Sequence, residues 1–170
     1  MTRHRDRQDF ERIAFIDLEA SGLGSASFPT EIGWAFVREN DAIESGSCLI
    51  RPIARWTMYA NAWSSTAERL TGISREMLDR DGLPPSEAVA RLFAAVNGRN
   101  IYSDQPDFDA HWLAMLADAA GGPVGDLKLG SAARLLDQAG AVFEFDEASV
   151  HRAEADARRL AVAVAKAFFR

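Results

Sequence analysis

Near the start of the sequence, two carboxylates lie two positions apart in the stretch FIDLEASG, residues 15–22. The apolar run from Ile13 to Leu18 predicts a buried β-strand. Because alternate residues of a strand point to the same face, we expect Asp17 and Glu19 to lie side by side at its end. Two like charges in a half-buried place repel each other, and a divalent cation converts that repulsion into shared ligation. Taken alone, the pair is more simply explained as two strand-end carboxylates that face solvent.

A second acidic group is the stretch SDQPDFD, residues 103–109. It follows a short apolar run, residues 100–103, that predicts a strand, and it opens a predicted helix whose first turn suits Pro106. Aspartate is favoured at helix caps and first turns, so each acid alone has a structural explanation. Three aspartates within six residues exceed what one cap requires, and the last of them could point back over the strand ends. These aspartates are Asp104, Asp107 and Asp109.

The third stretch whose residue types could take part in catalysis is HRAEAD, residues 151–156. His151 and Asp156 are five positions apart, which is about 140° around an ideal helix. They can reach one cleft together if His151 lies on the loop that leads into the helix. The alternatives are a histidine exposed at a helix start and an aspartate that pairs with Arg152 or Arg159.

Taken together, these stretches supply four carboxylates and one histidine, each expected at a strand end or a helix start. Four oxygen donors suit a pair of magnesium or manganese ions. Two such ions about 3.5–4 Å apart stabilise both the attacking and the leaving oxygen of a phosphoryl displacement. A histidine can accept the proton of the attacking water. The combination predicts a metal-dependent phosphodiesterase.

The elements that must position these residues can be read from periodicity and turn signals. Strands are predicted first, and helices mixed with short strands follow, which is typical of an α/β layered domain. The turn character of residues 42–46 predicts an antiparallel meander of the first three strands. Thr71-Gly72 predicts a break between two short helices. The predicted strands are residues 13–18, 31–38, 47–51, 100–103 and 127–129, and the longer helices begin near residues 85, 106, 132 and 152.

The composition of the chain excludes several classes of protein. Its 170 residues suit one domain, residues 1–170, and a formal net charge of −6 argues against a protein that coats nucleic acid through a broad basic surface. Cys48 is the only cysteine and the three histidines are scattered, so we expect no disulfide and no zinc site. No apolar run approaches the roughly 18 residues of a membrane span, and residues 1–11 read as a polar extension without a secretory signal. We therefore expect a cytoplasmic protein with no membrane contact.

At these residues the chain resembles the DEDDh 3′–5′ exonucleases, which include the proofreading epsilon subunit of bacterial DNA polymerase III, RNase T and oligoribonuclease. The D-x-E motif of that family is matched by residues 17–19, its F-D motif by residues 108–109, and its H-x-x-x-x-D motif by residues 151–156. EIG at residues 31–33 and LTGI at residues 70–73 resemble two further segments. The likeness covers almost the whole chain with its motifs in the family's order.

The resemblance implies a fold, a cofactor and a role for each residue. The fold would be RNase H-like, a five-stranded mixed sheet with an antiparallel start and helices on both sides. His151 would be the general base that activates water. The product would be a nucleoside 5′-monophosphate, released from the 3′ end of single-stranded DNA or RNA. The ligands of two divalent cations, Mg²⁺ or Mn²⁺, would be Asp17, Glu19, Asp109 and Asp156.

The resemblance also implies where the substrate lies, and there the chain departs from the family. The segment Ala20-Ser21-Gly22-Leu23 would lie along the 3′-terminal nucleotide, with Leu23 as a wedge against the last base. The alternative for Leu23 is a loop residue that covers the core. Family members often have Thr-Thr-Gly where this chain has Ala20, Ser21 and Gly22. Many have asparagine where this chain has Asp104, a carboxylate that could repel a phosphate or recruit a cation.

Three hypotheses of function follow. The first is the metal-dependent exonuclease, and the second is a non-catalytic module that kept the fold and binds nucleic acid or a polymerase. The third is an ordinary scaffold whose acids are caps and salt-bridge partners. Retention of all four acids and the histidine favours the first. The sequence leaves open the choice between DNA and RNA, and whether the chain forms a homodimer or joins a polymerase.

Overall fold

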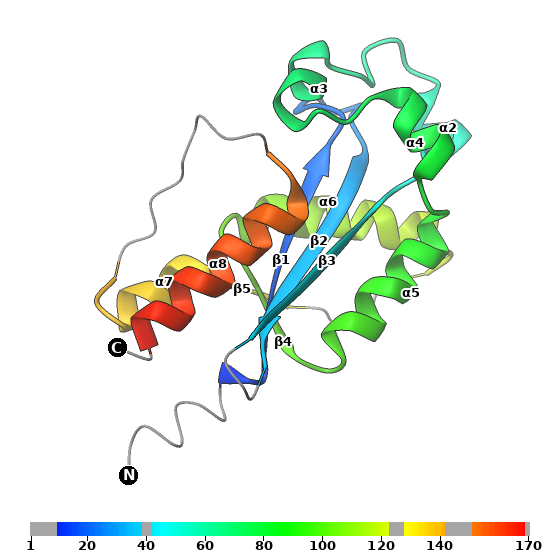
Figure 1. Ribbon diagram of the computed structural model, residues 1–170. Helices are drawn as coiled ribbons and strands as arrows, with labels where there is room; N and C mark the ends of the chain where they lie inside the picture. The colour runs from blue at the N-terminus through cyan, green and yellow to red at the C-terminus, as the bar shows by residue number, and fades with distance from the viewer. Residues whose placement is uncertain (1–9, 39–41, 123–127, 142–150, 169–170) are drawn as a thin grey trace.

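The chain folds around one mixed β-sheet with helices on both faces (Figure 1). The computed structural model describes residues 10–38, 42–122, 128–141 and 151–168. Within them the sheet has five strands in the order β3-β2-β1-β4-β5. The first three are antiparallel, and β4 and β5 run parallel to β1, as predicted. The strands are β1 (Ile13–Ala20), β2 (Pro29–Val37), β3 (Ile43–Leu49), β4 (Asn100–Ser103) and β5 (Leu129–Ser131).

The third strand is where the sequence prediction was wrong. The strand was expected over residues 47–51 after a turn at residues 42–46, but β3 already pairs with β2 at Ile43. Gly46, which suggested the turn, lies opposite Trp34 inside the ladder. A β-carbon at this glycine would come within 2.9 Å of the Trp34 indole. The glycine therefore marks a close packing contact rather than a turn.

The four helices whose starts were predicted begin within one residue of the expected positions. The break at Thr71-Gly72 is also confirmed, because Gly72 ends one short helix in the left-handed conformation with φ of 68°. The predicted last strand moves slightly, to Leu129–Ser131, and residue 127 lies outside the described residues. The described helices are α2 (Ala54–Thr57), α3 (Ser65–Thr71), α4 (Arg75–Asp81), α5 (Pro85–Val96), α6 (Pro106–Ala119), α7 (Ala132–Gln138) and α8 (Ala153–Phe168).

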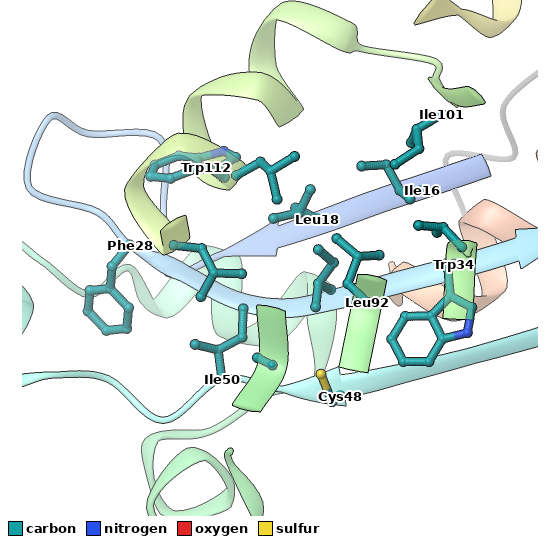
Figure 2. Packing of buried hydrophobic residues seen from close by; sticks show 14 of the residues in the cluster. Ile16, Leu18, Phe28, Trp34, Cys48, Ile50, Leu92, Ile101 and Trp112 are labelled. Atoms are coloured by element: carbon teal, nitrogen blue, oxygen red, sulfur yellow. The ribbon is translucent and has the colours of Figure 1, made fainter. Parts of the chain in front are cut away.

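The sheet buries both of its faces because successive strand residues point in opposite directions. Even-numbered residues of β1 and β2, such as Ile16, pack in one cluster with Leu92 of α5 and Trp112 of α6 (Figure 2). Odd-numbered residues, such as Phe15, pack in a second cluster with Leu160 of α8 and with α7. The two clusters fix β1 and β2 between two helical layers.

Two further sequence expectations can be compared with the described residues. Phe10 belongs to the predicted polar extension, residues 1–11, yet its ring is buried near Phe15 and Phe168. Residues 1–9 lie outside the described part of the chain. Among the helices described here, none has the length and apolar character needed to cross a bilayer.

The core contact of α5 leads to a stability prediction. Leu92→Ala removes a fully buried side chain and leaves a cavity, so we expect the free energy of unfolding to fall by about 3 kcal/mol. Leu23→Ala is the matched control, because Leu23 is 86% exposed and its truncation should leave the midpoint of denaturant unfolding unchanged. Equal effects of the two substitutions would contradict this account of the core.

Candidate active site

Asp17 and Glu19 lie inside the last half of β1, because the strand continues to Ala20. They pair across the ladder with Gly33 and Glu31 of β2, on the sheet face that α8 covers. On the other side of β1, Phe15 is level with Tyr102 of the parallel strand β4. Two residues beyond this pair lie Asp17 of β1 and Asp104, which directly follows the end of β4, and their carboxylates therefore come side by side. The sheet register brings together acids that are 87 positions apart in the sequence.

Asp109 is held in the first turn of α6 by contacts with two strands. It is 1% exposed, and its Oδ1 accepts a hydrogen bond of 3.3 Å from the main-chain nitrogen of Leu18. Its Oδ2 accepts a hydrogen bond from the fully buried hydroxyl of Ser103. The same hydroxyl accepts a hydrogen bond from the main-chain nitrogen of Gln105 at 3.0 Å. Ser103 thus fixes both the strand end and the acid, a role that the sequence analysis missed.

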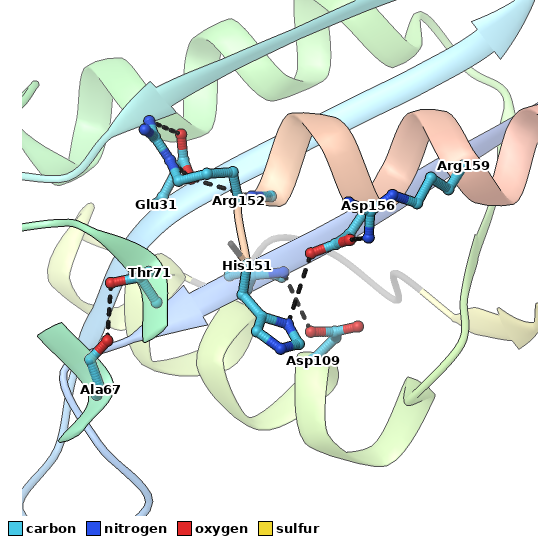
Figure 3. Close-up of polar contacts among 10 residues, drawn as sticks. Glu31, Ala67, Thr71, Asp109, His151, Arg152, Asp156 and Arg159 are labelled. Carbon is cyan, nitrogen blue, oxygen red and sulfur yellow. Dashed lines mark hydrogen bonds and ion pairs between the residues drawn. The ribbon is translucent and has the colours of Figure 1, made fainter. Parts of the chain in front are cut away.

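His151 and Asp156 reach the same place because His151 lies just before α8 rather than inside it. The main-chain nitrogen of His151 donates to the carbonyl oxygen of Leu70 at 3.0 Å. Its Nδ1 lies 3.9 Å from Oδ2 of the buried Asp156, as Figure 3 shows. The other oxygen of Asp156 accepts a hydrogen bond of 2.6 Å from Arg159. Of the two arginines considered as partners of Asp156, the structure selects Arg159.

The acidic side chains form two groups in which the possible ligand atoms lie within 4.8 Å of one another. Both groups combine residues from elements that are distant in the sequence. Oδ1 of Asp104 is buried and has no hydrogen-bond partner among the described residues, so a cation would satisfy it. Carboxylate oxygens are the donors that hard divalent cations prefer, so this donor set fits such ions. One group is Asp17, Asp104 and Asp109, and the other is Glu19, His151 and Asp156.

Crowding and burial change the proton affinity of these acids. Burial raises the pKa of Asp17 well above its usual range, and the charges of neighbouring carboxylates raise it further. Burial likewise raises the pKa of Glu19 to about 8 and that of Asp109 to about 7. The pKa values of Asp104 and Asp156 are also raised, in each case first by burial. Without a cation, protons therefore neutralise part of the cluster near neutral pH.

An apolar pocket of about 350 Å³ adjoins the acids. Leu23, Leu70 and Phe108 contribute to its lining, and these three apolar side chains are 86%, 51% and 39% exposed. The alternative in which Leu23 covers the core is therefore wrong. Ala20 and Gly22 also line the pocket, alongside Glu19 and His151. An apolar surface beside a group of acids can hold the uncharged part of a ligand whose charged part the acids bind through a cation.

Ser21 differs from its neighbours in the same loop. Its side chain is buried, and its hydroxyl donates to the carbonyl oxygen of Ala62 at 2.6 Å. The hydroxyl also accepts a hydrogen bond of 3.0 Å from the main-chain nitrogen of Phe28. Both contacts hold the loop in shape, so the Ser21 side chain is occupied within the protein rather than facing the pocket.

Comparison with known proteins shows the fold of the chain. The sequence matches no model of a protein family, and no curated protein matches it. Among solved structures, exonuclease I of E. coli in complex with a dA16 oligonucleotide is similar with a TM-score of 0.65 and 15% identity, over 91% of this chain and 40% of that chain. The zinc-bound form of an E. coli exonuclease I complex with single-stranded DNA gives 0.64 and 16%, over 91% and 40%. A full-length 3′-exonuclease gives 0.59 and 15%, over 91% and 80%.

These likenesses show that the chain has the RNase H-like fold of these exonucleases, as the sequence resemblance implied. The chain spans about 40% of the length of the exonuclease I chains that it matches. At sequence identities of 14–16%, the similarity to exonuclease I concerns the fold alone.

The raised pKa values predict how the metal-free protein responds to pH. A carboxyl whose pKa is raised by folding binds more protons in the folded state, so stability falls as pH rises from about 4 to the pKa of about 8 at Glu19. Asp17→Asn removes one of these groups, and we expect it to stabilise the protein in EDTA at pH 8 by about 1 kcal/mol. Thermal unfolding in EDTA at pH 5 and pH 8 measures both effects.

The control for this substitution is Asp79→Asn, which changes an exposed aspartate of α4. It should leave the pH dependence of unfolding unchanged. A wild-type protein equally stable at both pH values, with no gain from Asp17→Asn, would contradict the view that these acids are crowded and partly protonated.

Proposed function

We propose that this protein is a metal-dependent 3′–5′ exonuclease that hydrolyses phosphodiester bonds at the 3′ end of single-stranded DNA or RNA. The products would be nucleoside 5′-monophosphates. The observation that carries the proposal is the meeting of two groups of metal-binding side chains beside one apolar pocket. The likeness in fold to exonuclease I, whose structures include complexes with single-stranded DNA, supports it.

Each of the two groups of side chains would hold one divalent cation, Mg²⁺ or Mn²⁺. Asp17 and Asp109 would hold one cation, and Glu19 and Asp156 would hold the other. Asp17 lies close enough to both groups for the charges of their carboxylates to raise its pKa. When bound, such a pair neutralises the charge that develops on the attacking and leaving oxygens of a phosphoryl displacement. The raised pKa values mean that the cations displace protons when they bind, so affinity increases with pH.

His151 is the proposed general base. Its imidazole is 31% exposed and lines the pocket, so water can reach it. Nδ1 faces Asp156, which leaves Nε2 to accept the proton of an attacking water molecule. The hydrogen bond from its main-chain nitrogen to Leu70 holds the residue at the pocket edge. His151 therefore joins the acidic centre to the apolar pocket.

The apolar pocket is the proposed place of the 3′-terminal nucleoside. Leu23 and Phe108 offer exposed apolar surface on which any base can stack, which suits an enzyme without sequence preference. Ala20 and Gly22 allow close approach of the sugar, because neither presents a bulky side chain. The phosphate on the 5′ side of this nucleotide would then lie over the acids.

Asp104 is the proposed additional ligand of the first cation. Its place in the group with Asp17 and Asp109, and the unsatisfied buried oxygen, support recruitment of a cation over direct contact with the nucleotide. An extra carboxylate raises the affinity of an oxygen site for a divalent cation by adding charge and a donor.

A nuclease assay tests the proposal. We expect single-stranded DNA or RNA labelled at the 5′ end to shorten stepwise from its 3′ end with Mg²⁺ or Mn²⁺ and to stay intact with EDTA. Asp17→Ala should abolish cleavage, and His151→Ala should lower kcat by a factor of about 10²–10⁴. The controls Asp79→Ala and His111→Ala change an aspartate and a histidine outside the two ligand groups and should cut normally. A folded wild-type protein that binds the strand without cutting it would favour the non-catalytic module.

Substitution of Asp104 gives a separate prediction. If Asp104 holds a cation, Asp104→Asn should raise the metal concentration for half-maximal activity about tenfold, with a smaller loss at saturating metal. The matched control is Asp107→Asn, which replaces an exposed aspartate three positions later, at the start of α6. Faster cleavage by Asp104→Asn with an unchanged metal requirement would mean that Asp104 repels the substrate phosphate instead.

A further inference from the structure

We infer that Glu31 and Arg152 form a positioning pair that holds the start of α8 against β2. In this way His151 and Asp156 are kept facing the acids of β1. The inference rests on the proposed function, because the ligands that the pair positions are those of the proposed metal centre. Neither Glu31 nor Arg152 belongs to the two groups of metal-binding side chains among the described residues.

Glu31 is buried to 1% exposure, and its carboxylate accepts hydrogen bonds from four donors. Arg152 donates from Nε to Oε2 at 3.0 Å and from Nη2 to Oε1 at 2.8 Å. The main-chain nitrogen of Ala153 donates to Oε2 at 3.0 Å, and the hydroxyl of Ser47 donates to Oε1 at 3.0 Å. A carboxylate offers about four lone-pair sites, so all of them are used here. Glu31 therefore acts on the helix start and has no free oxygen for a cation.

The β1–β2 register explains why this contact serves the site. Glu31 lies opposite Glu19, and Gly33 lies opposite Asp17, so all four positions are on one face of the sheet. A β-carbon at Gly33 would lie only 2.2 Å from the carbonyl carbon of Ala153. The backbone at the start of α8 therefore rests directly on β2 at one point and is hydrogen-bonded to it two residues away. The two acids of β1 are the immediate neighbours of this contact.

Charge gives the pair a second effect. Like charges directly opposite each other in a sheet are destabilising, and Glu31 faces Glu19 in this way. The charges of Glu31 and Arg152 both act on Glu19, in opposite directions. With both partners present, the pair beside Glu19 is neutral. Without the charge of Glu31, the guanidinium of Arg152 becomes an uncompensated cation next to the ligands and competes with a metal ion.

The test measures Mn²⁺ binding to the metal-free protein by electron paramagnetic resonance, without substrate. We expect Glu31→Gln to weaken Mn²⁺ binding about tenfold, through loss of the fixed helix start and through the uncompensated charge. Hydrogen exchange at the amides of residues 153–156 should be faster than in the wild type. The double substitution Glu31→Gln with Arg152→Gln removes both charges and should recover part of the Mn²⁺ affinity. Glu44→Gln is the matched control, because Glu44 forms an exposed ion pair with Arg38.

Either of two results with the wild type and Glu31→Gln would overturn the inference. The first is a folded Glu31→Gln protein whose Mn²⁺ affinity is within twofold of the wild type and whose amide exchange at the start of α8 is unchanged. The second is a wild-type protein that binds no Mn²⁺, which would overturn the proposed function as well and so differs from failure of the pair alone. If Glu31→Gln does not fold, Arg152→Lys decides instead, since lysine keeps the charge but loses the two-point contact. Weaker Mn²⁺ binding by that variant supports the pair, and unchanged binding overturns it.

Discussion

Like charges repel most strongly where water is excluded, and five carboxylates of the described residues come together where β1 and β4 end. In the unfolded chain these side chains are hydrated and far apart. Folding removes much of that hydration, and the raised pKa values of Asp17, Glu19 and Asp109 express its cost. An arrangement of this kind persists only when the surrounding structure is strong enough to hold it, and when something binds to it that offsets the repulsion.

Hydrogen bonds and apolar packing hold the elements that carry these acids in place. The start of α6 is attached to two strands through Asp109, which accepts hydrogen bonds from Leu18 and Ser103. The start of α8 is attached to β2 through Glu31, and His151, two residues before this helix, is attached to α3 through the carbonyl oxygen of Leu70. Behind these polar contacts lie the two apolar clusters that fix β1 and β2 between helical layers. The apolar core holds β1 and β2 in place. Buried hydrogen bonds then hold the starts of α6 and α8, which carry Asp109 and Asp156, against these strands.

The sequence predicted what depends on local pattern. Apolar runs, turn signals and helical spacing were enough for the order of strands and the helix starts. The family resemblance added the five-stranded mixed sheet, and the motifs predicted that Asp17, Glu19, Asp109, His151 and Asp156 share one site. What it missed depends on packing between distant segments. Gly46 read as a turn because nothing local reveals that the Trp34 indole lies against it.

The partners of buried polar groups were missed for the same reason. The sequence offered two arginines near Asp156 and could not choose between them, because the choice depends on which strand α8 rests upon. The serine hydroxyls gave no sign of their roles either, since Ser21 bonds from its loop to the distant Ala62 and Ser103 bonds from β4 to Asp109 of α6. Local pattern therefore identifies which residues meet, whereas packing decides how each one is held.

The charge of the whole site bears on how it would treat a substrate. Among the described residues, six carboxylates lie in or beside it, and two arginines pair with two of them. With every one of these acids ionised, the formal charge of these eight groups is −4, which two divalent cations balance. In the proposed metal-loaded site, the carboxylate of Asp104 completes that balance before any substrate is bound. A phosphate would then enter a neutral centre rather than one with excess positive charge, so its binding would depend more on the apolar pocket beside Leu23 and Phe108. In the proposed site, an aspartate rather than an asparagine at position 104 would thus shift the source of substrate affinity from the phosphate to the nucleoside.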